Sequence, residues 1–470
     1  MPAHHAALRL SALACALAFH AMTAGSAGLP PEPSYKGELM GDGKGGVAVR
    51  PLPPDAQDAA PSEQKPRTER RTPPERRPQI TPLAEPEPQR GPGAGPQTLS
   101  VGVSQKIRTI AQAAKIARSG DTILVEPGVY AGDVAVFTQD NLTIRVAGGR
   151  ARLNASGASA EGKGIWVVRG GHIVVENFEF VGARVPNHNG AGIRFEKGRL
   201  VLRNCLFRDN ENGILTSGNK EAELEIENTE FDRNGTEDGF GHQLYAGEIA
   251  SLKVSGSYFH NAVGGHLLKS RAGVNHILYN RLSDEAGGEA SYELEFPSGG
   301  QAYVVGNIIE QSASTQNPAI VAVGLEGYRW PKNELYLINN TIIDDLPAKG
   351  VFLRVAPGMQ LLKAMNNVLV GERGHDLGML SGEGKNGAGQ GDGMKTEVRN
   401  NVSATREEFA QAAQFDYRVR DRSKLVGKYQ PPGSANGVDL TPRAEYAHPA
   451  QSRRLAAAPT LPGALQSVAR

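Results

Sequence analysis

The sequence contains little cysteine, few aromatic residues and almost no net charge. Its 470 residues include 2 Cys, 6% aromatic residues, and 51 Lys and Arg against 50 Asp and Glu. The balanced charge excludes a polycation that coats nucleic acid, and the low aromatic content disfavours a large compact α/β enzyme core. No apolar run approaches the roughly 18 residues of a membrane-spanning helix, so a helical membrane protein is excluded too.

The N-terminus is predicted to be an export signal. Residues 1–27 combine a weakly basic start, a short apolar stretch and small residues at 25–27. Removal of this signal also removes Cys15, so Cys205 is left alone and no intramolecular disulfide can form. Export without a disulfide indicates a bacterial periplasm or the extracellular medium, and Cys205 is interpreted as a small core residue.

Pro-rich segments flank the middle of the chain. Residues 28–99 hold 16 of the 30 prolines and one aromatic residue, Tyr35. Such a segment cannot bury enough apolar surface to offset its chain entropy, so we predict a disordered linker. Residues 426–470 are again rich in Pro, Ala and Gly, and we predict a disordered tail there. The folded domain is therefore expected at 100–425.

The middle of the chain is a repeat. An Asn between two short alternating runs recurs at intervals of 24 to 34 residues. A period of this size is typical of a solenoid, in which each coil buries its apolar face only against its neighbours. Asn side chains stacked in a tight bend can hydrogen-bond along the axis, which would explain one Asn per coil. The repeated positions are Asn177, Asn204, Asn228, Gly256, Asn280, Asn307, Asn340, Asn367 and Asn401.

The repeat favours a parallel β-helix. The Leu-x-x-Leu-x-Leu frame of leucine-rich repeats is missing, and propeller blades are longer. Residues 107–119 form an amphipathic helical stretch that can cap the first coil, and 121–130 read Asp-Thr-Ile-Leu-Val-Glu-Pro-Gly-Val-Tyr. This opening resembles the right-handed parallel β-helix superfamily of pectate-lyase-like proteins. The resemblance covers 100–425 and implies an all-β, right-handed single-stranded parallel β-helix with an N-terminal capping helix, but no particular activity.

One wall of this predicted β-helix carries a dense polar patch. The inward column of the wall is Ile193, Ile214, Leu244, Leu268 and Leu294. Strand residues alternate between two faces, so both neighbours of each apolar position are expected to point outward. Tyr245, Lys269 and Glu295 then form a ladder on three successive coils. The rest of the patch consists of Arg194, His242, Gln243, His266, Arg271, Tyr292 and Glu293.

A loop after the next strand of this wall adds Tyr328, Arg329 and Trp330. A Trp beside Tyr and Arg suits stacking on a sugar ring and holding its carboxylate. A structural plug for the loop is an equally good interpretation. Simpler roles also exist in the patch, because Lys269 and Glu295 can form a plain cross-strand ion pair.

An open wall suits an extended polymer better than a small metabolite, which needs a concave pocket. β-Elimination in a uronic-acid polysaccharide needs a cation for the C6 carboxylate, a base for the C5 proton and an acid for the departing O4. Lys269 is expected to be the base, with a pKa lowered by Arg271 and partial desolvation. Arg271 or His266 offsets the carboxylate, and Tyr245 protonates the leaving oxygen. Lys269 and Tyr245 can also exchange these roles.

Three alternatives stand beside elimination. Glu293 and Glu295 share a strand face and could flank a glycosidic bond for hydrolysis, but the Asn-Thr-Asp, Asp-pair and Gly-His-Gly motifs of galacturonase-type β-helix hydrolases are missing. A C5-epimerase would share the proton abstraction without cleavage. A non-catalytic carbohydrate-binding β-helix is the third alternative, although binding alone favours aromatic rows over a titratable cluster.

Lys269-Ser270 followed by Asn275 and Asn280 resembles the alginate and dermatan lyase family of β-helices. In that family a Lys-Ser places the catalytic lysine before an x-Asn-x-x-x-x-Asn turn, so the resemblance implies that Lys269 is the base. The family's calcium ligands precede the lysine, where this chain has Ala-Val-Gly-Gly at 262–265, and its acid arginine lies on the next coil, where this chain has Ser-Tyr-Glu at 291–293. No cofactor is therefore expected to be required, and Ca²⁺ would need other ligands. The sequence thus predicts an exported, monomeric polysaccharide lyase whose partner is an anionic polysaccharide, not nucleic acid.

Overall fold

The computed structural model describes residues 38–41, 47–50, 95–315, 317–347, 350–371 and 393–469. The chain divides into two units, Met1–Glu85 and Pro86–Arg470. In the first unit, β1 (Glu38–Gly41) and β2 (Val47–Arg50) form an antiparallel pair. The predicted export signal lies outside the described residues. So does the predicted linker, apart from these two strands and residues 95–99.

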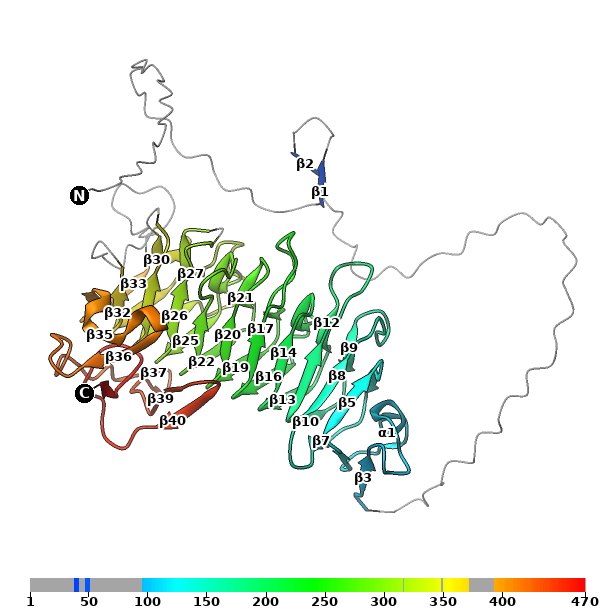
Figure 1. The fold of residues 1–470 in the computed structure, drawn as a ribbon. Helices are drawn as coiled ribbons and strands as arrows, with labels where there is room; N and C mark the ends of the chain where they lie inside the picture. Colours follow the sequence, from blue (N-terminus) through cyan, green and yellow to red (C-terminus); the bar gives the residue numbers. More distant parts are fainter. Residues whose placement is uncertain are drawn as a thin grey trace, which may run out of the picture. The chain divides into compact units, whose positions relative to one another are not determined.

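Three parallel sheets build the second unit, and the chain visits them in turn on each coil (Figure 1). The first sheet contains β3 (Thr98–Val101), β4 (Thr122–Val125), β7 (Leu142–Val146), β10 (His172–Glu176), β13 (Arg199–Arg203), β16 (Glu223–Glu227), β19 (Ser251–Ser255), β22 (Val274–Leu278), β25 (Gln301–Val305), β28 (Glu334–Ile338), β31 (Leu361–Met365) and β33 (Lys395–Arg399). The second sheet contains β5 (Gly128–Ala131), β8 (Ala151–Asn154), β11 (Phe178–Val181), β14 (Leu206–Arg208), β17 (Glu230–Asp232), β20 (Tyr258–His260), β23 (Arg281–Ser283), β26 (Ile308–Gln311), β29 (Thr341–Asp344), β32 (Val368–Val370) and β34 (Val402–Ala404).

The third sheet carries the predicted polar patch. It contains β6 (Ala135–Phe137), β9 (Gly164–Val168), β12 (Ala191–Phe195), β15 (Asn212–Thr216), β18 (Leu244–Ala246), β21 (His266–Ser270), β24 (Tyr292–Phe296), β27 (Ala319–Val323) and β30 (Val351–Val355). Neighbouring strands in all three sheets pair in parallel, each strand with its counterpart on the next coil. The predicted all-β parallel solenoid is confirmed.

A short helix, α1 (Ile110–Ile116), lies inside the helical stretch predicted at 107–119, at the end of the solenoid that begins with β3 (Figure 1). Thr109 and Gln112 form a capping box at its N-terminus. The backbone N–H groups of Ile110 and Ala111 donate to the Asp133 carboxylate at 2.6 and 2.8 Å. The buried face of α1 joins the core that the first coils share.

Apolar columns fill the interior of the coils. The five residues of the predicted inward column of the third sheet are all fully buried. On the second sheet, Phe180, Phe207, Phe231 and Phe259 stack with ring centroids 4.8, 5.1 and 4.4 Å apart. These distances are close to the strand spacing of a parallel sheet, so identical residues on successive coils lie in van der Waals contact.

The repeated Asn occupies two columns, not the single one that the sequence suggested. Asn177, Asn204 and Asn228 belong to a column of turn residues with left-handed backbone, which Asn and Gly tolerate best. The period read from the sequence slips by one residue between Gly256 and Asn280, because Tyr279 holds this turn position. The column with φ from 50° to 69° is Asn177, Asn204, Asn228, Gly256, Tyr279, Gly306, Asn339, Asn366 and Asn400.

The residue after each turn position forms a second column, which points inward and ties the coils together. From the second turn position onward, its members are Cys205, Thr229, Ser257, Asn280, Asn307, Asn340, Asn367 and Asn401. In each consecutive pair, the backbone N–H of the earlier member donates to the side-chain oxygen of the next, at 2.9–3.3 Å. The predicted hydrogen bonding of stacked Asn along the axis is therefore confirmed from Asn280 to Asn401. Cys205 is buried at the start of this column, as predicted, and burial raises the pKa of its thiol to about 11.

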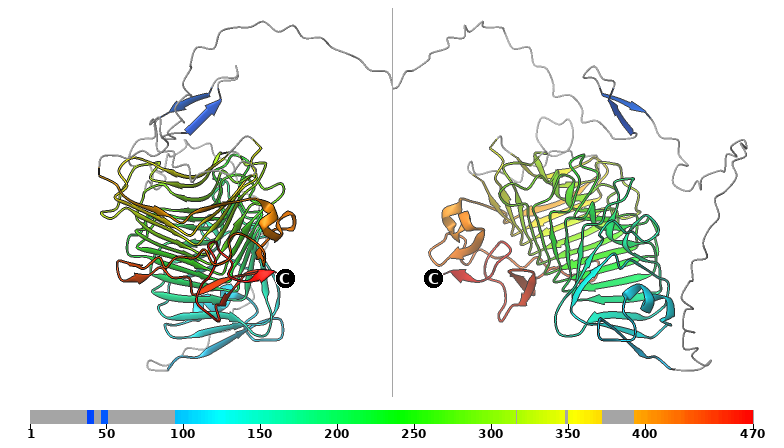
Figure 2. Two further views of the ribbon diagram at one scale, coloured as in Figure 1. Left: turned by 90° about the vertical axis from the view of Figure 1, so that its left-hand side faces the viewer. Right: turned by 45° about the vertical axis from the view of Figure 1, so that its right-hand side comes forward.

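The prediction of a disordered tail at 426–470 is wrong. Leu440 and Leu461 are fully buried, and Figure 2 shows the C-terminal segment, in orange and red, lying along one side of the coils. The Asn339 and Asn366 side chains donate to the carbonyls of Leu461 and Gln430 at 3.0 and 2.7 Å. A few well-placed leucines and this row of amides therefore anchor a segment whose overall composition indicated disorder. The elements within 426–470 are β37 (Ser434–Ala435), β38 (Val438–Asp439), β39 (Ala444–Ala447), β40 (Gln451–Arg454) and β41 (Val468–Ala469). They are preceded by η1 (Arg406–Glu408), β35 (Phe409–Gln411), η2 (Ala412–Gln414) and β36 (Asp416–Arg420).

Replacing Asn307 by Ala tests the inner column. Its oxygen accepts from the backbone N–H of Asn280, and its amide donates to the carbonyl of Ile277 at 2.7 Å. The Ala variant leaves both buried groups unsatisfied, so we expect a loss of about 2–3 kcal/mol in the free energy of unfolding by urea denaturation. Asn189→Ala, at an exposed loop position, is the control and should change that free energy by less than about 0.5 kcal/mol. Equal losses in the two variants would contradict the role of the column.

Candidate active site on the third sheet

The predicted ladder of Tyr245, Lys269 and Glu295 is present on β18, β21 and β24. Tyr245 is the register partner of Lys269, and Lys269 is the partner of Glu295. Adjacent partners are about 4.8 Å apart in a parallel sheet, so their side chains can interact directly. On either side of the ladder the same column holds Leu215 and Ala322, so the polar section is confined to three coils.

An alternating chain of charged and polar groups surrounds this ladder. The Lys269 ammonium lies 3.3 Å from a carboxylate oxygen of Glu295 and 3.1 Å from one of Glu326. The other oxygen of Glu326 lies 2.5 Å from Nη1 of Arg271, whose Nε donates to the Tyr245 hydroxyl at 2.9 Å. At the other end, Nε2 of His266 lies 2.9 Å from Glu295. Cations and carboxylates thus alternate along the chain, and each offsets its neighbours.

These contacts decide the protonation state of Lys269. Burial acts to lower the pKa of Lys269, but Glu295 and Glu326 outweigh burial, and the pKa is raised. Arg271 and burial both act to lower this pKa, as expected, but the expected net lowering is wrong because the two carboxylates that contact the ammonium outweigh them. Burial alone would raise the pKa of Glu295, yet His266 and Lys269 lower it to about 2. Both Lys269 and Glu295 are therefore ionised at neutral pH.

His266 differs from Lys269 because burial dominates its electrostatics. Burial lowers the pKa of His266, although contact with Glu295 opposes that shift. Burial lowers the pKa of His242 still further, and Lys269 and Arg271 add to the effect. Both imidazoles are therefore neutral at pH 7, and only the lysine and the arginine supply positive charge to the chain of contacts.

A locked turn holds Lys269 and Arg271 in place. The residue between them, Ser270, is buried, and its hydroxyl hydrogen-bonds to the Asn275 side chain at 2.6 Å. That hydroxyl also accepts from the backbone N–H of Ala272 at 3.2 Å, while the Asn275 amide donates to the Ala272 carbonyl at 3.0 Å. The Lys-Ser and Asn of the sequence motif thus have a local role, because they fix the end of β21 from which both cations project.

The prediction that Gln243 and Glu293 lie on the outer face is wrong, because both side chains point into the coil. The strand pairing skips this position on several coils, and a Cβ on the equivalent Gly192 would meet the core ring of Phe207 at 2.7 Å. Gln243 is fully buried and donates to the carbonyl of His260 at 2.5 Å. Glu293 is also fully buried, and burial raises its pKa well above the usual range. Neither residue can contact a polymer on the outer wall, and a hydrolytic pair of Glu293 and Glu295 is excluded.

His242, His266 and Tyr292 form a column of contacting rings beside the ladder, with the two imidazoles edge to face and the Tyr292 ring tilted. Nδ1 of His242 accepts from the backbone N–H of His266 at 3.0 Å, and the two imidazole centroids are 4.7 Å apart. The Tyr292 ring lies 5.1 Å from that of His266. All three rings are buried. His242 thus satisfies a backbone N–H at the start of β21, and His266 contacts Glu295.

Arg194 is separated from the chain of contacts. It lies in the same outward column as Tyr245, but Leu215 stands between them. Burial lowers the pKa of the Arg194 guanidinium. The structure therefore does not bring Arg194 together with Lys269 and Arg271.

The loop after β27 has structural contacts at all three of its predicted binding residues. The Tyr328 hydroxyl donates to the carbonyl of Ala356 at 2.7 Å, and the Trp330 indole N–H donates to the carbonyl of Arg271 at 2.9 Å. Arg329 pairs with Glu248 at 2.8 Å. These contacts anchor the loop beside the end of β21, so the interpretation of the loop as a structural plug describes its geometry.

Sequence reasoning missed two members of the site, Glu326 and Ser298. Glu326 begins the same loop, and Ser298 accepts from Arg271 at 3.2 Å. No pattern in the sequence shows that the loop returns its first carboxylate to β21. That contact depends on the two anchoring bonds of Tyr328 and Trp330.

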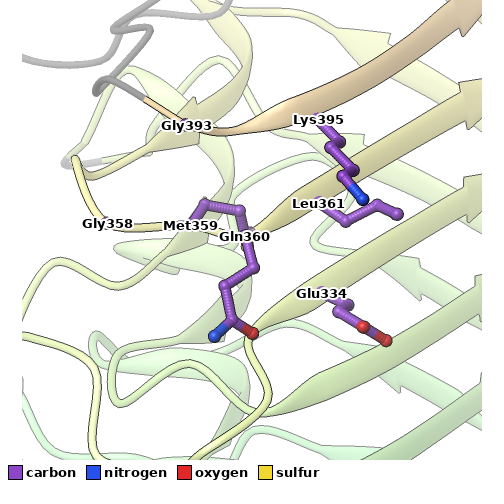
Figure 3. Close-up of a pocket in the computed structure, with 7 residues that line it drawn as sticks. All are labelled: Glu334, Gly358, Met359, Gln360, Leu361, Gly393 and Lys395. Carbon is purple, nitrogen blue, oxygen red and sulfur yellow. The ribbon is translucent and has the colours of Figure 1, made fainter.

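A separate pocket of about 400 Å³ lies on the first sheet (Figure 3). Glu334, Leu361 and Lys395 project into it from β28, β31 and β33, where they are register partners. Glu334 already accepts from Gln301 at 2.9 Å, so the pocket holds no cluster like that on the third sheet. Within the described part of the chain, no group of three or more His, Cys, Asp and Glu is arranged to hold a metal ion. Independence from calcium stays a prediction.

Comparison with known proteins identifies the fold. A family model described as "Right handed beta helix region" matches residues 127–282. The fold is a right-handed parallel β-helix. No curated protein matches the chain. Among solved structures, the β-helix is similar to pectate lyase Pel9A, with 13% identity, a TM-score of 0.47, and coverage of 80% of this chain and 97% of that one.

A second solved structure is a mutant of the PL6 family alginate lyase AlyGC. It has 15% identity, a TM-score of 0.25, and coverage of 65% of the β-helix chain and 51% of its own. Among the described residues, no helix combines the length and the apolar character needed to cross a membrane.

The low pKa of Glu295 predicts how the site responds to acid. A carboxylate whose pKa falls from 4.5 to about 2 on folding stabilises the native state above pH 4.5, and this stabilisation is lost as the pH falls towards 2. Urea midpoints measured across this range should therefore fall more steeply for the natural chain than for Glu295→Gln. Parallel curves for the two proteins would contradict the ion pair of Glu295 with Lys269 and the contact of Glu295 with His266.

Proposed function

We propose that this β-helix is a polysaccharide lyase that cleaves a uronic-acid-containing polymer by β-elimination at the cluster of Tyr245, Lys269 and Arg271. The observation that carries the proposal is the pairing of two fixed cations with a phenol hydroxyl on one outer wall. β-Elimination needs a cation for the carboxylate, a base and an acid within one sugar ring. An anionic polymer is the substrate class that this wall suits, because the open sheet face offers length instead of an enclosed pocket.

The protonation states assign the two proton-transfer roles. Lys269 is held as an ammonium by Glu295 and Glu326, so it suits the acid that protonates the departing O4. Tyr245 then takes the base role. Arg271 donates to its oxygen at 2.9 Å, and the positive charge of Arg271 offsets the negative charge of a phenolate. This is the exchanged assignment of the two roles, and it replaces Lys269 as the base.

The reaction balances with these groups alone. Tyr245 in its phenolate form takes the C5 proton, and the C5–H electron pair becomes the C4–C5 double bond. The C4–O4 bond breaks as Lys269 transfers a proton to O4. Lys269 then regains a proton from solvent, and Tyr245 holds the abstracted proton as a phenol until solvent removes it for the next turnover. Arg271 and Lys269 together offset the carboxylate charge that grows when C5 loses its proton.

The remaining charged and aromatic residues act as positioning residues in this proposal. Glu295 and His266 hold the ammonium from the buried side, and Trp330 fixes the backbone of Arg271. Arg329 lies at the edge of the same wall, where it can contact a longer polymer. Export to the periplasm or medium belongs to the same proposal, because a polymeric substrate lies outside the cytoplasm. A monomeric state is proposed with it.

The test is an assay of the purified full-length chain with galacturonan, mannuronan, guluronan and glucuronan. Ultraviolet absorbance detects the conjugated unsaturated uronate that only elimination creates. We expect product from at least one polymer. The rate should fall by about 100-fold or more in Tyr245→Phe and in Lys269→Met, because a proton-transfer group contributes at least that much.

Two controls make this assay decisive. Lys253→Met removes a lysine that pairs with Glu225 on the first sheet, at 2.5 Å, and should leave the rate unchanged. Proton NMR of the polymers detects inversion at C5. Inversion without unsaturated product would make the protein an epimerase and refute the lyase, and full activity in Tyr245→Phe would refute the assigned base.

A further inference from the structure

The Glu326 carboxylate bridges the two cations of the site. One oxygen lies 3.1 Å from the Lys269 ammonium, and the other lies 2.5 Å from Nη1 of Arg271. A carboxylate that contacts an ammonium and a guanidinium with its two oxygens is in the arrangement in which proteins bind free carboxylates. The position of Glu326 thus marks a carboxylate-binding site that the chain fills with its own side chain.

While Tyr245 is a neutral phenol, the charges of the cluster balance only when Glu326 is present. Lys269 and Arg271 each carry one positive charge, while Glu295 and Glu326 each carry one negative charge. The side chain of Glu295 is only 4% exposed and contacts Lys269 alone of the two cations, whereas that of Glu326 is 40% exposed and lies on the solvent side. Displacement of Glu326 therefore leaves a net charge of +1 that faces solvent, which one carboxylate neutralises.

The loop allows the Glu326 side chain to leave without unfolding. The backbone N–H of Glu326 donates to the carbonyl of Pro297 at 3.0 Å, and that of Gly327 donates to Gly324 at 2.9 Å. The loop is further anchored by Tyr328 and Trp330. The backbone thus stays fixed while rotation about the side-chain bonds of Glu326 carries the carboxylate into solvent and exposes Lys269, whose side chain is 13% exposed.

We propose that the space between Lys269 and Arg271 is the subsite for the C6 carboxylate of the uronate, and that Glu326 occupies it until substrate displaces it. This inference rests on the proposed function and deepens it, because it assigns the carboxylate position and adds Glu326 as a residue that determines specificity. A neutral sugar cannot replace the Glu326 charge, so the resident carboxylate selects for an anionic ring.

The subsite also orients the substrate for the proposed reaction. C5 is bonded to C6, and Arg271 contacts both the carboxylate position and the Tyr245 hydroxyl. A carboxylate in the place of Glu326 therefore brings the C5 proton towards Tyr245. O4 is attached to the neighbouring carbon C4, so the ammonium of Lys269 can contact the carboxylate and O4 together.

The test measures binding separately from catalysis. Calorimetric titration of the full-length chain with D-galacturonate and D-glucuronate gives the dissociation constants, with galactose and glucose as neutral probes. Glu326→Gln and Glu326→Ala remove the internal competitor, so we expect each to lower the dissociation constant for at least one uronate about fivefold, the effect of losing one partly exposed ion pair. The neutral sugars should not gain affinity.

Glu225→Gln is the matched control. Glu225 also bridges a lysine and an arginine, Lys253 at 2.5 Å and Arg199 at 3.1 Å, but on the first sheet. We expect this variant to bind uronates as the natural chain does. An equal gain in affinity here would mean that any change of net charge suffices, which would overturn the inference.

The remaining outcomes separate the subsite from the lyase. Unchanged or weaker uronate binding in both Glu326 variants would overturn the subsite even if the absorbance assay shows elimination. Tighter binding in these variants, together with no unsaturated product from any polymer, would support the subsite and refute the lyase. Loss of activity in Glu326→Gln with tighter binding would make Glu326 a group that the reaction itself uses, which overturns its role as a mere occupant.

Discussion

The fixed register between neighbouring coils is the constraint on which the rest of this structure depends. It is set by the three parallel ladders and by the inner column from Cys205 to Asn401, in which each backbone N–H is bound by a side chain of the next coil. Residues at equal positions on successive coils are therefore held about 4.8 Å apart. At that distance the choice of side chain on one coil limits the choice on the next.

The polar cluster follows from this constraint. Tyr245, Lys269 and Glu295 occupy one column, so a lysine in the middle must have partners that tolerate its charge. Glu295 supplies one from the interior and Glu326 supplies the other from the solvent side. The result is a cluster in which charge is fixed in place but balanced, and in which the outer partner can be exchanged for a carboxylate from a polymer.

The sequence predicted the features that follow from regular strand alternation. The inward column from Ile193 to Leu294 and the outward ladder through Lys269 both follow from strand alternation, and both are confirmed. Alternation failed at the position of Gln243 and Glu293, which the strand pairing skips and where both side chains point inward. The repeat period also failed to distinguish Asn228 from Asn280. Asn228 occupies a left-handed turn position, whereas Asn280 belongs to the inner column.

Contacts between distant segments could not be predicted. Glu326 reaches Lys269 across 57 residues of sequence, and its position depends on a loop whose anchors have no repeating pattern. The C-terminal segment was misjudged for a similar reason, since composition does not show that Leu440 and Leu461 meet an apolar outer face of the coils. In each case a single long-range contact outweighed the local signal.

The most direct test of the account is a crystal structure of the Tyr245→Phe variant with a bound uronate oligosaccharide. The account predicts a sugar carboxylate between Lys269 and Arg271, the Glu326 side chain turned towards solvent, and C5 facing the ring at position 245. An oligosaccharide bound on another wall, or on this wall with Glu326 still bridging the two cations, would contradict it.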